Sequence, residues 1–188
     1  MKYKRLFLVM ILLISIFTSG CASPSTIGKV IMDSDFRNEK IYVSNAWQFY
    51  LNEKQISHES FISCYKPYAE AIYSKSVDYS NDDVYCPCFK ERYIESMKNY
   101  NEFLALDAPE SLQEDHIFIE SFLNSSYHGY YEQYLMCTSN NLEDFIKHDS
   151  EASLYKTKKV VGIIQFNGLY KNWMLKYYDI TVTDDMLE

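Results

Sequence analysis

The chain contains few glycines and no glycine-rich motif. Only five of its 188 residues are glycine, and after Gly20 the remaining four, Gly28, Gly129, Gly162 and Gly168, stand far apart. The nucleotide-binding motifs Gly-x-Gly-x-x-Gly and Gly-x4-Gly-Lys-Ser/Thr are absent, and so is the Gly-x-Ser-x-Gly turn that presents a serine nucleophile in many hydrolases. The sequence therefore excludes the common nucleotide-binding loops and this type of nucleophile.

The sequence also lacks a hydrophobic run long enough to cross a membrane. Its longest apolar run extends from Leu6 to Phe17, is interrupted by a single serine, and follows three cations within the first five residues. A transmembrane helix needs ~20 apolar residues, so this run is too short to remain as an anchor. An apolar run preceded by cations and followed by small residues is typical of an export signal, and we predict that residues 1–20 are a signal peptide.

The residues at the end of this segment resemble a known processing site. The sequence Phe17-Thr18-Ser19-Gly20-Cys21 resembles the lipobox of bacterial lipoproteins, although Thr18 occupies a position where that family most often has leucine. In that family the peptide is cut before the cysteine, which carries a diacylglycerol thioether and usually a third acyl chain on its amine. The resemblance therefore implies lipidation of Cys21, and two or three acyl chains hold a protein firmly to a bilayer.

Two further features suggest where the protein lies and what it binds. Ala22 follows the cysteine where inner-membrane lipoproteins often carry aspartate, so the resemblance favours the outer membrane, facing the periplasm. Removal of residues 1–20 leaves 15 Lys+Arg against 26 Asp+Glu, a formal charge of −11. This charge repels nucleic acid and favours either a cationic protein partner or simply a soluble acidic surface.

Four cysteines remain in the exported part, and an even number in an oxidising compartment predicts two disulfides. A bond between Cys86 and Cys88 would close a very small ring around Pro87, so we expect one of them to join Cys64 and the other Cys137. The sequence leaves open which of the two pairs with which. The Cys-x-Cys spacing matches neither the usual zinc motif nor the Cys-x-x-Cys redox motif.

The expected domain organisation is a lipidated tether at residues 21–40, followed by one globular domain at residues 41–188. The tether prediction follows from a Ser-, Pro-, Gly-, Asp- and Asn-containing segment with few large apolar residues. Within the domain, apolar residues at helical intervals predict helices in these ranges: 46–51 and 57–73, about 87–106, a longer helix to about Cys137, and 142–147. At Pro67 we expect either a kink or a break that divides the helix into two pieces. Asp107 with Glu110, and Asn140 with Glu143, resemble capping signals for the last two helices.

The last part of the chain predicts a different structure. Apolar β-branched residues precede Asn167-Gly168, a pair that readily forms a type I′ turn, and a run rich in Tyr, Trp, Ile, Thr and Val follows. We therefore favour an antiparallel β-hairpin over residues 160–182, which makes the predicted fold class α+β, mostly helical. The alternative is a final helix with Val160, Ile163, Tyr170, Trp173 and Tyr177 on one face.

The search for chemistry identifies no catalytic residue and no metal or cofactor site. No sequence pattern connects any of the four histidines to a nucleophile. His116 and Glu120 share a helical face, but two ligands are too few for a metal site.

Tyrosine is unusually frequent, with 18 residues. Four of them, Tyr127, Tyr130, Tyr131 and Tyr134, lie within two turns of one predicted helix. Rigid amphipathic rings suit a protein–protein interface, so we treat these four as a candidate partner face, with core packing as the alternative.

These features favour a non-enzymatic envelope lipoprotein that binds another protein. In size, lipid anchoring, acidity and disulfide use the chain is similar to the periplasmic immunity and inhibitor lipoproteins that protect bacteria from toxins. Two alternatives stay open: a small envelope hydrolase with an unfamiliar site that includes His116 or His128, and a structural envelope lipoprotein without a specific client.

Overall fold

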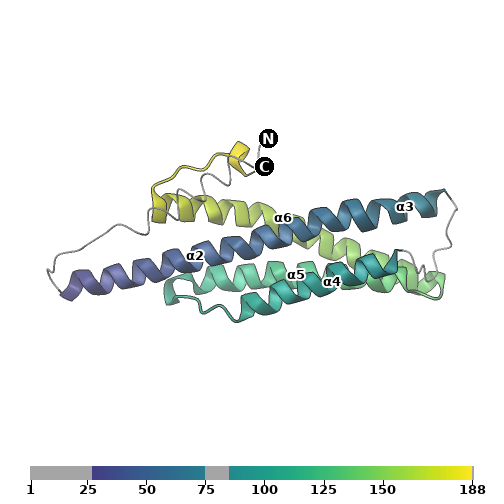
Figure 1. The fold of residues 1–188 in the computed structure, drawn as a ribbon, viewed down its shortest axis with the longest axis horizontal. Helices are drawn as coiled ribbons and strands as arrows, with labels where there is room; N and C mark the ends of the chain where they lie inside the picture. Colours follow the sequence, from purple (N-terminus) through teal and green to yellow (C-terminus); the bar gives the residue numbers. More distant parts are fainter. Residues whose placement is uncertain (1–26, 75–84, 188) are drawn as a thin grey trace. The chain divides into compact units, whose positions relative to one another are not determined.

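A computed structural model describes residues 27–74 and 85–187, with side chains from residue 34 onward. The chain divides into two compact units, residues 1–34 and 35–188, and the account below concerns the second. In the described residues all regular structure is helical (Figure 1). The elements are α2 (Ile27–Glu59), the π-helical turn η2 (Ser60–Tyr65), α3 (Lys66–Tyr73), α4 (Cys86–Leu104), the 3-10 turn η3 (Glu110–Leu112), α5 (Gln113–Cys137), α6 (Leu142–Tyr178) and the 3-10 turn η4 (Asp184–Met186).

The prediction of an α+β fold with a C-terminal hairpin is wrong. Residues 160–178 belong to α6, which runs without interruption through Asn167 and Gly168. The reason is a stripe of large side chains at helical spacing: Phe166, Trp173 and Tyr177 are all buried on one side of the helix. In a hairpin the neighbouring residues Trp173 and Met174 would point to opposite faces, whereas in α6 both are buried together.

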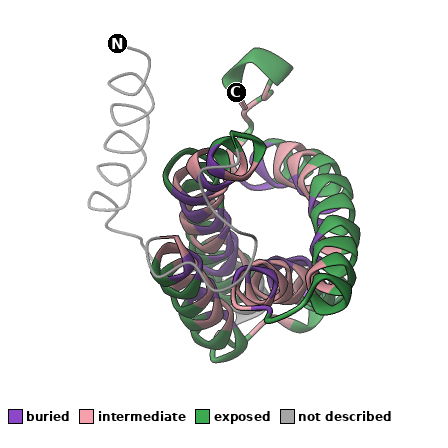
Figure 2. Cartoon of the chain, turned by 90° about the vertical axis from the view of Figure 1, so that its right-hand side faces the viewer, coloured by how far each residue is buried: buried purple, intermediate pink, exposed green. Residues whose placement is uncertain are grey.

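The helices of this unit enclose an aromatic core. Within residues 35–187, α2, α4, α5 and α6 lie side by side (Figure 1), and their buried residues face one another when viewed along the helices (Figure 2). Trp47 stacks on Tyr170 with ring centroids 3.7 Å apart, and Tyr50 stacks on Phe166 at 4.2 Å. The larger cluster of buried residues comprises Tyr42, Val43, Ala46, Tyr50, Phe103, Leu112, Ile119, Phe122, Leu123, Phe166, Trp173 and Tyr177.

The interior also contains a charged pair. Glu53 of α2 is fully buried and accepts a hydrogen bond from Lys159 Nζ of α6 at 3.0 Å and from Ser96 Oγ of α4 at 2.9 Å. Lys159 Nζ also donates to the hydroxyl of Tyr130 on α5. Burial alone would lower the pKa of Lys159, but Glu53 and Tyr130 stabilise the ammonium and raise it. This network joins all four long helices through paired rather than isolated charges.

Two disulfides fasten one end of the bundle, as the cysteine count predicts. Cys64 pairs with Cys88, and Cys86 pairs with Cys137, which resolves the pairing that the sequence left open. Pro87 lies in the first turn of α4, so the two neighbouring cysteines point toward different partners. Around them packs a second buried cluster of Cys64, Tyr68, Cys86, Phe89, Met136 and Cys137.

A π-helical turn precedes Pro67, where the sequence predicts a kink or a broken helix. Proline has no N–H and cannot continue the α-helical hydrogen-bond ladder. Just before it, the backbone N–H of Lys66 donates to the carbonyl of Phe61, five residues back. Pro67 then occupies the first turn of α3, which continues directly from η2.

The two predicted capping signals differ from those observed. Neither η3 nor α5 begins with a side-chain cap, so the expected capping box of Asp107 and Glu110 does not form. At α6 the cap is Asn141, one residue beyond Asn140, and its side chain accepts from the Asp144 backbone N–H at 2.9 Å. The sequence predicts the start of α6 at Leu142 correctly, but the helix ends at Tyr178 instead of about residue 147.

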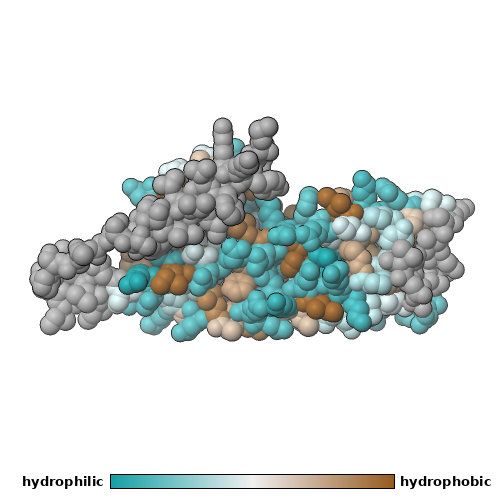
Figure 3. Space-filling view, viewed as in Figure 1, coloured by the Kyte–Doolittle hydropathy of each residue, from teal (hydrophilic) through white to brown (hydrophobic). Residues whose placement is uncertain are grey.

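The described part of the expected tether is helical. The domain was expected to begin at Ile41, but α2 already starts at Ile27, and the ring of Phe36 lies 5.4 Å from that of Tyr177. No described helix is sufficiently long and apolar to cross a membrane. Figure 3 shows hydrophobic side chains in separate small patches among hydrophilic ones on the face in view.

Candidate functional site

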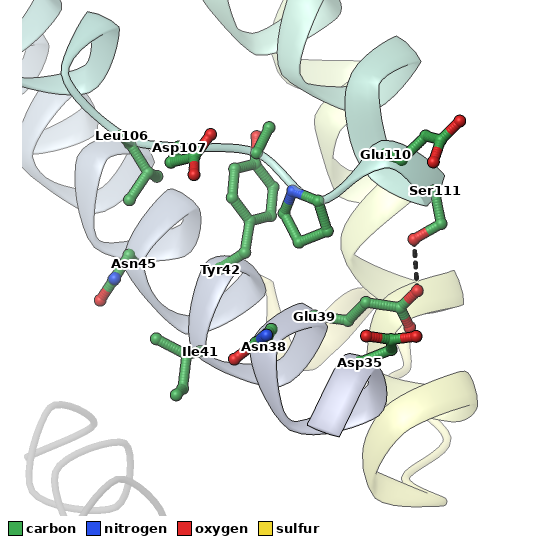
Figure 4. A pocket seen from close by; sticks show the side chains of 12 residues that line it. Asp35, Asn38, Glu39, Ile41, Tyr42, Asn45, Leu106, Asp107, Glu110 and Ser111 are labelled. Atoms are coloured by element: carbon green, nitrogen blue, oxygen red, sulfur yellow. Dashed lines mark hydrogen bonds between the residues drawn. The ribbon is translucent and has the colours of Figure 1, made fainter. Parts of the chain in front are cut away.

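A cavity of about 750 Å³ lies between the start of α2 in this unit and the segment that joins α4 to α5. Helix α2 contributes one wall, with side chains about one turn apart, and the α4–α5 segment with η3 contributes the other (Figure 4). We call this the acidic cavity. Its lining comprises Asp35, Asn38, Glu39, Ile41, Tyr42, Asn45, Leu106, Asp107, Ala108, Pro109, Glu110 and Ser111.

The charge of this lining is entirely negative. Four side chains carry carboxylates, namely Asp35, Glu39, Asp107 and Glu110, and no Lys, Arg or His belongs to the described lining. Asp35, Asp107 and Glu110 are solvent-exposed. Because a concave surface with one sign of charge concentrates the field, the acidic cavity attracts cations more strongly than the same charges on a flat surface would.

Glu39 is the carboxylate held most firmly in this wall. Burial by itself would raise the pKa of Glu39, but hydrogen bonds from Ser111 and Tyr177 and the charge of Lys176 outweigh it, so the pKa lies below its ordinary value of 4.5. Lys176 Nζ lies 3.7 Å from Glu39 Oε2. The hydrogen bond from Ser111 crosses the cavity from η3 to α2 and is drawn in Figure 4. Glu39 therefore remains ionised and fixes the two walls to each other.

The inner wall of the acidic cavity rests on Tyr42 and His116. The Tyr42 hydroxyl lies 3.1 Å from His116 Nδ1, and the imidazole ring stacks on Phe103 with centroids 4.6 Å apart. Burial, and secondarily the charge of Asp115, raise the pKa of Tyr42, so it stays neutral at physiological pH. Asp115 itself accepts a hydrogen bond from Trp173 Nε1 at 2.8 Å. His116 is thus a half-buried residue that packs on Phe103 and has a tyrosine partner.

Among the described residues no group of three or more His, Cys, Asp or Glu side chains is close enough to hold a metal ion. Glu120 accepts from Tyr100 Oη at 3.4 Å, whereas His116 contacts Tyr42, so these two residues do not form a joint site. The acidic cavity presents spaced negative charges, which suit a basic side chain of another molecule.

The tyrosines predicted as a partner face do not share one exposed surface. Tyr130 is buried beside Lys159, with 6% of its surface exposed. Tyr127, Tyr131 and Tyr134 are half-buried, and the first two pack against tyrosines of α4: Tyr127 lies 5.2 Å from Tyr100, and Tyr131 lies 5.0 Å from Tyr93, between ring centroids. Tyr127 and Tyr131 therefore pack between α5 and α4, Tyr130 contacts Lys159 of α6, and Tyr134 packs against the second buried cluster.

His128 and His148 both make contacts between α5 and α6. His128 stacks between Tyr127 and Tyr155, at centroid distances of 4.2 and 5.5 Å. His148 Nδ1 lies 2.6 Å from Glu132 Oε2, which is a contact between α6 and α5. Cys21 and the predicted signal peptide fall outside the described residues.

Sequence reasoning missed the acidic cavity. Asp35 and Glu39 lay in the expected tether, and Asp107 and Glu110 were interpreted as helix caps. The only available signal was the i, i+4 spacing of Asp35 and Glu39, which is common on solvated helices. The two pairs line the same cavity only because tertiary structure places the α4–α5 segment beside α2.

Comparison with known proteins adds no family to this description. No protein-family model, no curated protein and no solved structure matches the chain.

Proposed function

We propose that this protein is an exported lipoprotein that acts by binding a cationic protein through the acidic cavity, in the manner of an immunity or inhibitor protein. The observation that carries the proposal is the pairing of a large concavity with a wholly negative lining. A lysine or arginine side chain of a partner would replace water in the cavity and meet several carboxylates at once.

The contacts that fix the walls of the acidic cavity support a role in recognition. The two walls of the acidic cavity are joined by the hydrogen bond from Ser111 to Glu39, and Lys176 of α6 pairs with the same carboxylate. A preorganised surface loses little conformational entropy on binding. The likeness to immunity and inhibitor lipoproteins in size, acidity and disulfide use agrees with this role.

The cellular setting is part of the same proposal. Lipidation of Cys21 would hold the helical unit at the cell envelope, at the outer membrane facing the periplasm. Mass spectrometry of the membrane fraction tests this part separately, because a diacylglycerol-modified Cys21 peptide is expected and an unmodified one would contradict the anchor. In that compartment the two disulfides are stable.

A pull-down tests the binding role. The protein, with its disulfides formed, is used to capture partners from an envelope and secreted-protein extract at low and moderate salt. We expect a cationic protein that is retained at low salt and released as salt rises, because screening weakens contacts between exposed charges.

A charge-matched pair of variants makes the result specific. The test variant neutralises three exposed cavity carboxylates, as Asp35→Asn, Asp107→Asn and Glu110→Gln. The control removes the same number of exposed carboxylates elsewhere, as Glu70→Gln, Glu151→Gln and Asp185→Asn. Capture should be lost in the test variant and kept in the control; equal capture by both would show that net charge, and not the cavity, attracts the partner.

A further inference from the structure

A second cavity, of about 320 Å³, lies where η2 and the end of α2 approach α5 and α6. It shares no lining residue with the acidic cavity. We call it the serine cavity, because five serines line it: Ser57, Ser60, Ser125, Ser126 and Ser153. Its floor is formed by Tyr130 and Lys159, the two residues that connect it to the buried charge network.

Two buried polar atoms in its wall have no partner within the described protein. These are Ser126 Oγ and Gln133 Oε1, both on α5 and both fully shielded from solvent. Ser126 is 2% exposed. Because buried polar groups in native proteins nearly always find a hydrogen-bond partner, an unpaired hydroxyl and an unpaired carbonyl in one cavity wall indicate that a bound molecule completes them.

The charges around the serine cavity cancel. Lys159 is already paired with Glu53 directly behind it, at 3.0 Å. The other two charged residues of the lining are Lys156 and Asp149, which have opposite signs. A ligand with a net charge would therefore find no net counter-charge, and would lose its hydration without compensation.

The remaining lining combines hydroxyl groups with aromatic rings. Phe61, Tyr65 and Tyr155 add ring surface, while the serines and Gln133 supply donors and acceptors. Small-molecule sites combine apolar ring surface with a few placed polar groups in this way, and their volumes begin at about 300 Å³. We propose that the serine cavity binds a small neutral polyhydroxylated molecule, of the size and chemistry of a monosaccharide, whose hydroxyls pair with Ser126 and Gln133. This site is independent of the protein-binding role of the acidic cavity.

Ligand-observed NMR with the full chain tests this proposal. The neutral probes are glucose and N-acetylglucosamine at millimolar concentration, the charged probes are acetate and tetramethylammonium, and inorganic phosphate is added as a competitor. We expect saturation transfer to at least one neutral probe and none to the charged probes. Absence of transfer to both sugars, or displacement of a bound sugar by phosphate, would overturn the proposal.

A variant pair locates the binding. Ser126→Ala removes the unpaired hydroxyl, and Ser121→Ala removes an exposed hydroxyl on the same helix as the control. The first should weaken sugar binding about tenfold, as loss of one hydrogen bond in a buried site does, and the second should leave it unchanged. Ser126→Ala should not lower the melting temperature, because it removes an unsatisfied buried group. Equal affinity in both variants would place the sugar elsewhere and contradict the assignment.

Discussion

Gly168→Ala should stabilise the protein, because Gly168 lies within α6 in an ordinary helical conformation. None of the glycines in the described residues has a positive φ angle, and a Cβ added at Gly168 would meet no atom within 4 Å. Alanine is favoured over glycine inside a helix by about 0.5–1 kcal/mol, chiefly through the entropy of the unfolded chain. We therefore expect an increase of that size in the free energy of unfolding.

If residues 160–182 formed a β-hairpin, Gly168→Ala would instead lower the free energy of unfolding. In a type I′ turn the second residue of Asn-Gly has positive φ, which alanine adopts only with strain. The same substitution thus stabilises the helix and destabilises the hairpin. The measurement therefore decides the main structural disagreement with the sequence prediction.

Gly162→Ala, six residues earlier on the same helix, is the matched comparison. Its Cβ would lie 2.6 Å from Cδ2 of Phe122, whose side chain is buried. Overpacking costs roughly 1–3 kcal/mol, which exceeds the gain in helix propensity, so a net loss of roughly 1 kcal/mol is expected.

Urea unfolding followed by circular dichroism measures both variants against the parent protein. The predicted order of stability is Gly168→Ala, then the parent, then Gly162→Ala, with equal helical content in the native state. A less stable Gly168→Ala variant would refute the placement of Gly168 inside a helix. A Gly162→Ala variant as stable as the parent would refute the close packing of α6 on α5.

Three further outcomes follow from the structure. Lys159→Met should cost roughly 3–5 kcal/mol in chemical denaturation because it leaves the Glu53 carboxylate buried and unpaired, and replacing both residues by methionine should recover most of this loss. Cys137→Ser opens the disulfide with the larger sequence separation, 51 residues, and should lower the free energy of unfolding by about 4 kcal/mol; a parent protein equally stable with and without reductant would contradict this. Since the pKa of Glu39 is lowered on folding, its contribution is present above about pH 4.5 and is lost as the pH falls through the folded-state value, so Ser111→Ala should flatten the acid limb of a pH–stability curve.

Local signals predicted much of the bundle. Helix α4 was placed within two residues at both ends, because its apolar stripe is regular and Pro87 marks a start. The end of α5 at Cys137 was also predicted, but its start at Gln113 lies beyond the cap predicted at Asp107. The disulfide prediction also depended on a local feature. Because Cys86 and Cys88 are separated only by Pro87, they were not expected to pair with each other, and each needed a distant partner. The observed pairs agree with it.

The β-hairpin predicted over residues 160–182 was wrong because a local turn signal conflicted with tertiary packing. Asn167-Gly168 between β-branched and aromatic residues is a strong short-range turn signal. In the folded protein, burial of Phe166, Trp173 and Tyr177 against the other helices outweighs it. Asn167 instead accepts a hydrogen bond from Tyr50 Oη at 3.2 Å, so the turn residue is used as a helix-packing contact.

The acidic cavity could not be predicted from local patterns. Glu39 and Ser111 are 72 positions apart in the sequence, and their contact exists only when η3 lies against α2. The tyrosine-rich segment was easy to identify, but the sequence could not decide its role, because tyrosine side chains can pack in a core as well as contact a partner. Tyr130 shows the first use, in contact with Lys159.

Site-specific photo-crosslinking in intact cells tests the central claim, that the acidic cavity is the contact surface for a cationic protein. A photoreactive residue replaces Asn38, which lines the cavity, and in a second strain replaces Asn172, an exposed residue of α6 outside it. We predict a crosslinked basic protein from position 38 and none from position 172. A crosslink from position 172 alone, or the same product from both positions, would contradict the account.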